Sequence, residues 1–123
     1  MTARSLLATL LIALVSALPA VAETPAEQNR IRLALAALEN LQDDLFFIGY
    51  QSVQSAGADG QTYMLLDFRY DGQTPRERDL YASIDRICRT VLTNTRLVQD
   101  LSNAGYDMVS VAFDERSQYD CLP

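Results

Sequence analysis

The chain has 123 residues, with sixteen acidic side chains against ten basic ones, a formal net charge of −6 at pH 7 and no histidine. An acidic protein lacks the positive surface that binds phosphates, so we expect no nucleic-acid partner. The absence of histidine excludes Ser-His-Asp and Cys-His catalysis and histidine-ligated zinc, and the absence of lysine excludes side-chain Schiff bases. We therefore expect no metal site and no cofactor.

Residues 1–22 have the pattern of an export signal, with a positive charge at Arg4, a long apolar run and small residues before Glu23. The apolar run is shorter than the roughly 20 residues that span a bilayer comfortably, so a cleaved signal is favoured over an uncleaved anchor. We expect one small domain of residues 23–123, with a periplasmic or secreted address and no stable membrane span once the signal is removed.

Thr24, Pro25 and Glu27 form a helix start, because threonine caps, proline fits the first turn and glutamate reaches back to the cap. Apolar residues then recur at helical spacing, which predicts a helix to about Asp43.

Two strands are predicted by alternating side chains, over residues 45–53 and 63–70. In the first strand, the two faces are predicted to hold Phe46, Ile48 and Tyr50 on one side and Phe47, Gly49 and Gln51 on the other. The second strand has a strongly apolar face and a more polar one, as in a sheet that is covered on one side.

A second helix start, Thr74-Pro75-Arg76-Glu77, opens a long amphipathic pattern that ends at Gly105. Asn94 interrupts the apolar stripe of this helix, which predicts a kink or a thinner contact there. A last strand follows over residues 108–114. The order helix, strand, strand, helix, strand predicts a two-layer α+β domain in which two helices cover one face of a three-stranded sheet.

The tetrapeptide Asp-Gly-Gln-Thr occurs twice, at residues 59–62 and 71–74. The copies lie at opposite ends of the second predicted strand, roughly 26 Å apart, which is too far for one small ligand. Asp-Gly is a turn dipeptide, and the further oxygen ligands of a calcium loop are missing. We therefore interpret both copies as turns.

The two cysteines, Cys88 and Cys121, are predicted to form one disulfide, since an even count in an exported chain is typical of structural bridges. A redox-active pair would favour Cys-x-x-Cys spacing, which this chain lacks. The helix from Cys88 to Gly105 is about 25 Å long and the strand from Gly105 to Asp114 about 30 Å. Because the strand runs back antiparallel to the helix, its end is expected beside Cys88, and the tail after it can place Cys121 there.

A second candidate feature is a group of arginines on the long helix, Arg76, Arg78, Arg86 and Arg89. Guanidinium groups bind carboxylates and other anions bidentately, so these residues could form an anion contact. The favoured interpretation is a solvated helix face, because acidic residues are interleaved at helical ion-pair spacing.

A third candidate is an aromatic partner surface on the less buried sheet face, formed by Phe47, Tyr50, Tyr63 and Leu65. If no helix covers that face, an exposed patch of this kind would mark a surface for a protein partner. Asp67 and Arg69 are expected on the same face, as a site if they line a cleft and as surface decoration if they do not.

The segments "LDFRY", "IDRIC" and "GYDMVSVAFDER", with the closing Cys121, resemble small, functionally uncharacterised secreted proteins of bacteria that carry one disulfide. The resemblance covers about Tyr63–Cys121. It implies a periplasmic address and no particular activity, so no catalytic residues follow from it.

These observations favour a non-enzymatic periplasmic domain that binds or assists a protein partner in the cell envelope. The alternative is a small hydrolase that uses carboxylates and arginine on an envelope glycan or ester. Such an enzyme requires a cleft with two carboxyl groups about 5–10 Å apart. A third possibility is an envelope protein whose role is set by its genomic context.

Overall fold

The computed structural model describes residues 23–55 and 60–121, so the expected export signal lies outside the described residues. The fold is α+β, as predicted. Its helices are α1 (Pro25–Leu35), α2 (Glu77–Leu92) and α3 (Thr95–Ala104), with a 3-10 segment η1 (Ala36–Asn40). Its strands are β1 (Leu45–Gln54), β2 (Thr62–Tyr70), β3 (Met108–Ala112) and β4 (Gln118–Asp120).

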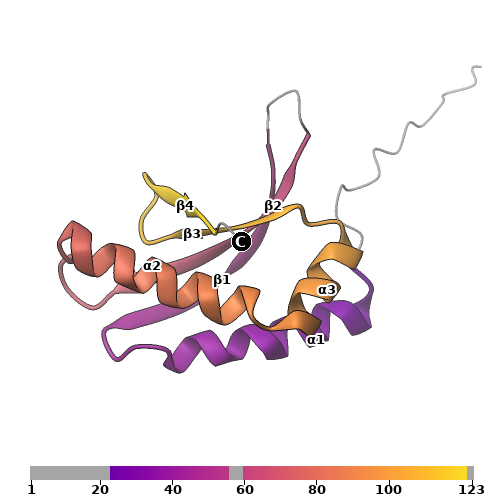
Figure 1. The fold of residues 1–123 in the computed structure, drawn as a ribbon, viewed down its shortest axis with the longest axis horizontal. Helices are drawn as coiled ribbons and strands as arrows, with labels where there is room; N and C mark the ends of the chain where they lie inside the picture. The colour runs from indigo at the N-terminus through magenta and orange to yellow at the C-terminus, as the bar shows by residue number, and fades with distance from the viewer. Residues whose placement is uncertain (1–22, 56–59, 122–123) are drawn as a thin grey trace, which may run out of the picture.

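The strands form a single sheet in the order β1-β2-β3-β4. β1 and β2 form an antiparallel hairpin, β2 and β3 pair in parallel, and β3 and β4 pair antiparallel. The three helices lie together on one side of this sheet (Figure 1), which gives two layers. The prediction of three strands is wrong, because the chain after β3 returns as a fourth strand. The prediction of two helices is also wrong, because the second one is divided.

The first helix begins at the predicted capping box. The Thr24 hydroxyl accepts a hydrogen bond from the backbone N–H of Glu27 and donates one to the Glu27 carboxylate, both at 3.1 Å. The α-helix ends at Leu35 instead of near Asp43, and η1 continues from it. Side chains three apart eclipse one another in 3-10 geometry, so Leu38 is buried below Leu35.

The long predicted helix is divided at Asn94, where the sequence predicts a kink. The Asn94 side chain accepts a hydrogen bond from the N–H of Leu97 at 3.1 Å and thereby caps α3. Gly105 ends α3 with a left-handed φ of 96°, as predicted. The prediction of a second capping box at Thr74 is wrong. α2 begins only at Glu77, and its N-cap residue, Arg76, makes no side-chain hydrogen bond. A cap contributes only about 1 kcal/mol, so packing of the helix on the sheet decides where it begins.

β2 is an inner strand of the sheet and provides the centre of the core. Its alternate residues Met64, Leu66 and Phe68 face the helices and are completely buried. The helical segments add Ile31, Leu35, Leu38, Ile84, Ile87, Val91, Leu97 and Leu101. The residues of β2 between these positions face the other side of the sheet and are only half-buried, which confirms the predicted difference between the faces.

An ion pair joins α1 to α3. Arg30 donates to the carboxylate of Asp100 through Nε at 3.3 and 3.4 Å and through Nη2 at 3.2 Å. These contacts raise the pKa of the Arg30 guanidinium. Asp100 is buried, and a buried carboxylate without such a partner would be costly.

Further hydrogen bonds fix Glu23 and the beginning of the parallel strands. The hydroxyl of Tyr106 donates to the carboxylate of Glu23, the first described residue, at 2.6 Å. Burial, and then this bond, raise the pKa of Tyr106. At the start of the parallel pair, the N–H of Thr62 donates to the Asp107 carboxylate at 2.8 Å, and the N–H of Asp107 donates to the Thr62 carbonyl at 2.7 Å.

The predicted disulfide is present between Cys88 in α2 and Cys121 directly after β4, with the two Cα atoms 5.2 Å apart. The N–H of Cys121 also donates to the carbonyl of Val109 at 2.8 Å, which holds Cys121 against β3. The tail between β3 and Cys121 includes the strand β4, which the sequence did not predict.

Replacing both cysteines by serine, Cys88→Ser with Cys121→Ser, is expected to lower the free energy of unfolding by about 3.5–4 kcal/mol, because the bridge closes a long loop in the unfolded chain. Urea unfolding of the oxidised wild type and the double variant, followed by circular dichroism, measures the difference. The wild type in reductant is the control and is expected to match the variant. A loss below about 1 kcal/mol would contradict a structural role for the bridge.

Candidate partner-binding face

We call the face of the sheet opposite the helices the open face. From the strand register it carries Phe46, Gln51, Val53, Tyr63, Leu65, Asp67, Arg69, Ser110, Ala112, Gln118 and Asp120. Its side chains on β2 alternate with the buried core residues and are half-buried. The open face is therefore a mixed polar and apolar surface.

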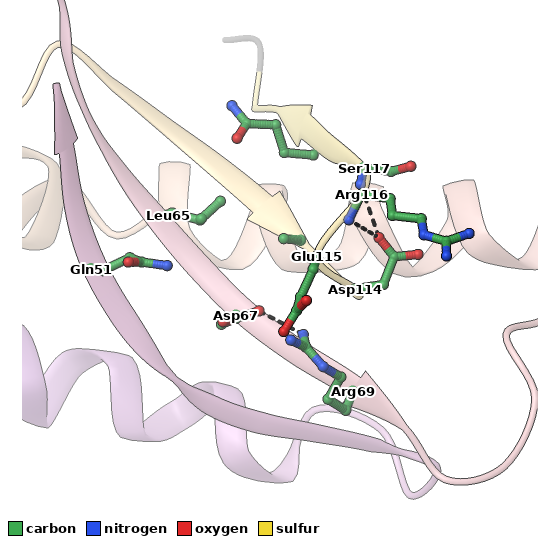
Figure 2. Close-up of a pocket in the computed structure, with 10 residues that line it drawn as sticks. Gln51, Leu65, Asp67, Arg69, Asp114, Glu115, Arg116 and Ser117 are labelled. Carbon is green, nitrogen blue, oxygen red and sulfur yellow. Dashed lines mark hydrogen bonds and ion pairs between the residues drawn. The ribbon is translucent and has the colours of Figure 1, made fainter. Parts of the chain in front are cut away.

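A cleft of about 300 Å³ lies on the open face. One side is formed by β2, with Asp67 and Arg69, and the other by the turn between β3 and β4 at residues 113–117 (Figure 2). Gln51 extends the lining onto β1. Figure 2 shows the side chain of Glu115 pointing toward the guanidinium of Arg69 across this space. The cleft thus brings together charges from two segments that are distant in the sequence.

Asp67 and Arg69 lie on the same face, as expected of residues two apart on a strand, and they form an ion pair. Nη1 of Arg69 lies 2.6 Å from Oδ1 of Asp67 and also donates to the carbonyl of Phe68 at 2.6 Å. The Arg69 side chain is 36% exposed and that of Asp67 is 26% exposed. Solvent therefore screens the pair, which contributes little to stability and remains accessible to a ligand.

The turn that forms the second side of the cleft is held by Asp114. Oδ1 of this carboxylate accepts hydrogen bonds from the N–H groups of Arg116 at 2.8 Å and Ser117 at 2.9 Å. These two bonds, and then the charges of Arg116 and Arg69, lower the pKa of Asp114. The carboxylate is therefore a charged anchor for the turn.

Side-chain hydrogen bonds hold the outer strands on the same face. The hydroxyl of Ser110 on β3 donates to the carboxylate of Asp120 on β4 at 2.7 Å. The hydroxyl of Tyr63 on β2 donates to the side-chain oxygen of Gln118 at 3.5 Å, across β3. These bonds fix the shape of the open face beside the cleft.

The structure divides the predicted aromatic partner surface between the two faces of the sheet. Tyr63 and Leu65 lie on the open face, where they are half-buried, and Leu65 lines the cleft. Phe47 and Tyr50 pair with Phe68 and Leu66, so they lie on the helix side and pack against the core. Only the first two residues therefore share a surface with the cleft.

The predicted alternation in β1 is broken by a β-bulge. Pairing steps from Phe47 directly to Gly49, so Ile48 is an extra residue. Phe46, before the bulge, is 54% exposed on the open face, while Ile48 is 59% exposed and Tyr50 returns to the core side. A glycine inside a strand often marks a bulge, so Gly49 was the available signal for these exposed side chains.

The four arginines of the predicted anion contact are spread along α2. Arg76 caps the helix and Arg89 lies in its last turn, about 20 Å away along the axis. Arg89 makes an ion pair with Asp85 at 2.8 Å, and Nη1 of Arg86 donates to the side-chain oxygen of Gln42 at 3.2 Å. Arg78 is exposed near the start of the helix. This arrangement fits a solvated helix face better than a clamp for one small anion.

Two further findings on residues 23–55 and 60–121 concern metal binding and membrane insertion. That part of the chain holds no group of three or more histidine, cysteine, aspartate or glutamate side chains arranged to bind a metal ion. It also holds no helix with the length and apolar character needed to cross a membrane.

Comparison of the chain with protein-family models, with curated proteins and with solved structures found no match in any of the three. The functional conclusions therefore rest on the residues of the open face and on the disulfide.

The carboxyl group of Asp114 is expected to titrate below the ordinary value of 3.8. Since its pKa is lowered by folding, its contribution to the turn is present above that value and is lost as the pH falls through the folded-state pKa. NMR titration of the side-chain carboxyl carbon measures it. In Arg116→Gln the two amide hydrogen bonds remain, so the pKa should rise slightly but stay below the ordinary value. Titration at or above 3.8 in the wild type would contradict the turn geometry.

Proposed function

We propose that the protein is an exported, non-enzymatic domain of the cell envelope that binds or assists a protein partner through the open face. Two observations support the envelope as its address. The Cys88–Cys121 disulfide is typical of oxidising compartments, and residues 1–22 have the pattern of an export signal.

The observation that carries the proposal is the cleft on the open face. Arg69 and Arg116 offer guanidinium groups there, while Asp67 and Glu115 offer carboxylates within the same lining. Leu65 adds apolar area beside them. Partly polar surfaces with such a mixture are typical of non-obligate protein interfaces. A suitable partner presents a loop that carries both an acidic and a basic side chain next to an apolar one.

The hydrolase alternative finds less support in the cleft. Its general acid would be a carboxyl group with a raised pKa, placed beside a second carboxylate. Asp114 has its pKa lowered by two backbone N–H groups, which favours a permanently charged group over a proton donor. Three carboxylates do line the cleft, so turnover of a glycan or ester is the outcome that would select the hydrolase.

A photo-crosslinking residue in place of Leu65 tests which face the partner occupies. With the chain expressed for export, it is expected to form a specific covalent complex in the envelope. The matched control is a crosslinker in place of Val98, an exposed apolar residue of α3 on the helix side. Complexes formed equally from both positions, or from Val98 alone, would reject the open face.

Arg69→Glu is expected to weaken binding of the purified partner roughly tenfold, because it places a carboxylate where the guanidinium meets an acidic group. Arg89→Glu is the matched control, since Arg89 carries the same charge on the exposed face of α2. We expect less than about a twofold change for it, as for surface charges away from an interface. Calorimetry with the isolated partner measures both. Equal effects of the two variants would indicate only long-range attraction.

A further inference from the structure

β1 lies at an edge of the sheet and, among the described residues, pairs only with β2. The outer edge of such a strand presents backbone N–H and C=O groups that can pair with another chain. β1 has ten residues, and its side chains Phe46 and Ile48 are more than half exposed. This edge is therefore a second surface, separate from the cleft, whose backbone groups and exposed apolar side chains can contact another chain.

A groove of about 340 Å³ lies between β1 and the first helical segments. We call it the edge groove, and it is lined by Arg32, Leu35, Ala36, Glu39, Phe47, Ile48, Gly49 and Tyr50. Most of these residues are apolar, and the charged ones, Arg32 and Glu39, are both exposed. The groove thus combines an apolar floor with one positive and one negative side chain.

The two charges lie toward opposite ends of the edge groove. Arg32 in α1 and Glu39 in η1 are separated by about 11–14 Å along the helical axis. The chain reverses direction between η1 and β1, so Arg32 lies toward Tyr50 and Glu39 toward Phe47. Burial raises the pKa of Tyr50 and the charge of Arg32 opposes this shift, which agrees with their proximity. The groove therefore has a polarity along β1.

The bulge places an apolar side chain at the rim of this groove. Because Ile48 is the extra residue between two paired positions, its side chain leaves the regular alternation of the strand. It lines the groove and is 59% exposed. An exposed isoleucine beside an apolar groove is a favourable contact if a second molecule covers it.

We infer that the β1 edge and the edge groove form the interface of a homodimer, with a second copy of this chain as the occupant. A two-fold axis near Ile48 sets the two β1 strands antiparallel and seats the Ile48 side chain of each copy in the groove of the other. The same two-fold rotation sets the edge groove of one copy antiparallel to the edge groove of the other. Arg32 of each copy then faces Glu39 of the second copy, so the ion pair forms twice.

This charge arrangement favours a second copy over an unrelated partner. A two-fold contact requires a surface that complements itself, and a positive end with a negative end across an apolar centre meets that requirement. Antiparallel pairing of the two β1 edges also satisfies backbone groups that one copy leaves to solvent. The cleft is lined mainly by β2 and the β3–β4 turn, so the dimer leaves it free and does not depend on the proposed function.

The first test uses the full chain expressed for export and purified with its disulfide formed. Sedimentation velocity from about 1 µM to several hundred µM is expected to show a monomer–dimer equilibrium. Ile48→Asp, which places a charge in each apolar groove, should weaken dimerisation at least tenfold. Leu33→Asp is the matched control, because Leu33 is 66% exposed on α1 but does not line the groove. It should leave the equilibrium unchanged.

A charge-reversal series separates the interface from effects on folding. Arg32→Glu alone should weaken the dimer roughly tenfold, because it places two like charges together at both ends. The double variant Arg32→Glu with Glu39→Arg restores both ion pairs in reversed sense and should recover the wild-type constant to within about threefold. Each variant is checked for an intact disulfide and unchanged thermal unfolding.

Three results would overturn the inference. The wild type could remain a monomer at the highest concentration, which would leave the groove to another occupant. Leu33→Asp could weaken the dimer as much as Ile48→Asp, which would place the interface elsewhere. The double charge reversal could fail to recover association, which would remove Arg32 and Glu39 from the contact.

Discussion

The disulfide between Cys88 and Cys121 is the constraint on which the C-terminal third of the domain depends. β4 has only three residues, so few backbone hydrogen bonds pair it with β3. The bridge fixes the residue after β4 to α2, and the hydrogen bond from Cys121 to Val109 holds the same point against β3. The turn before β4 is thereby held in place, and this turn forms one side of the cleft.

Much of the fold could be predicted from the sequence because its signals are local and repeated. The alternation in β2, the capping box at Thr24 and the terminating Gly105 each satisfy backbone or burial requirements within a few residues. β4 could not be predicted, since three residues show no periodicity and its pairing is decided by a distant cysteine. The bulge at Ile48 shifts the alternation after it, so Tyr50 joins Phe47 on the core side and the predicted aromatic surface is divided. The pair of Asp67 and Arg69 was visible in the sequence, but the cleft around it depends on the β3–β4 turn.

The two surfaces of the domain differ in chemistry and in position. The open face presents both charges within one cleft and suits a partner with a mixed loop. The edge groove separates its charges along an apolar floor and suits its own copy. Because the first involves mainly β2 and the β3–β4 turn and the second involves β1 with α1 and η1, one molecule can use both. A dimer of the kind inferred above would present two clefts and gain avidity for a repeated partner.

The parallel pairing of β2 with β3 has a consequence for the time at which the domain can fold. Thr62 and Asp107, which clamp the start of that pair, are 45 residues apart in the chain. Contacts between such distant residues form slowly, because a long loop must close before they contribute stability. A ribosome-bound chain that still lacks β3 has only the β1–β2 hairpin and the helices, so one flank of Phe68 stays uncovered. The domain therefore completes its core only once the residues of β3 are available to pair with β2.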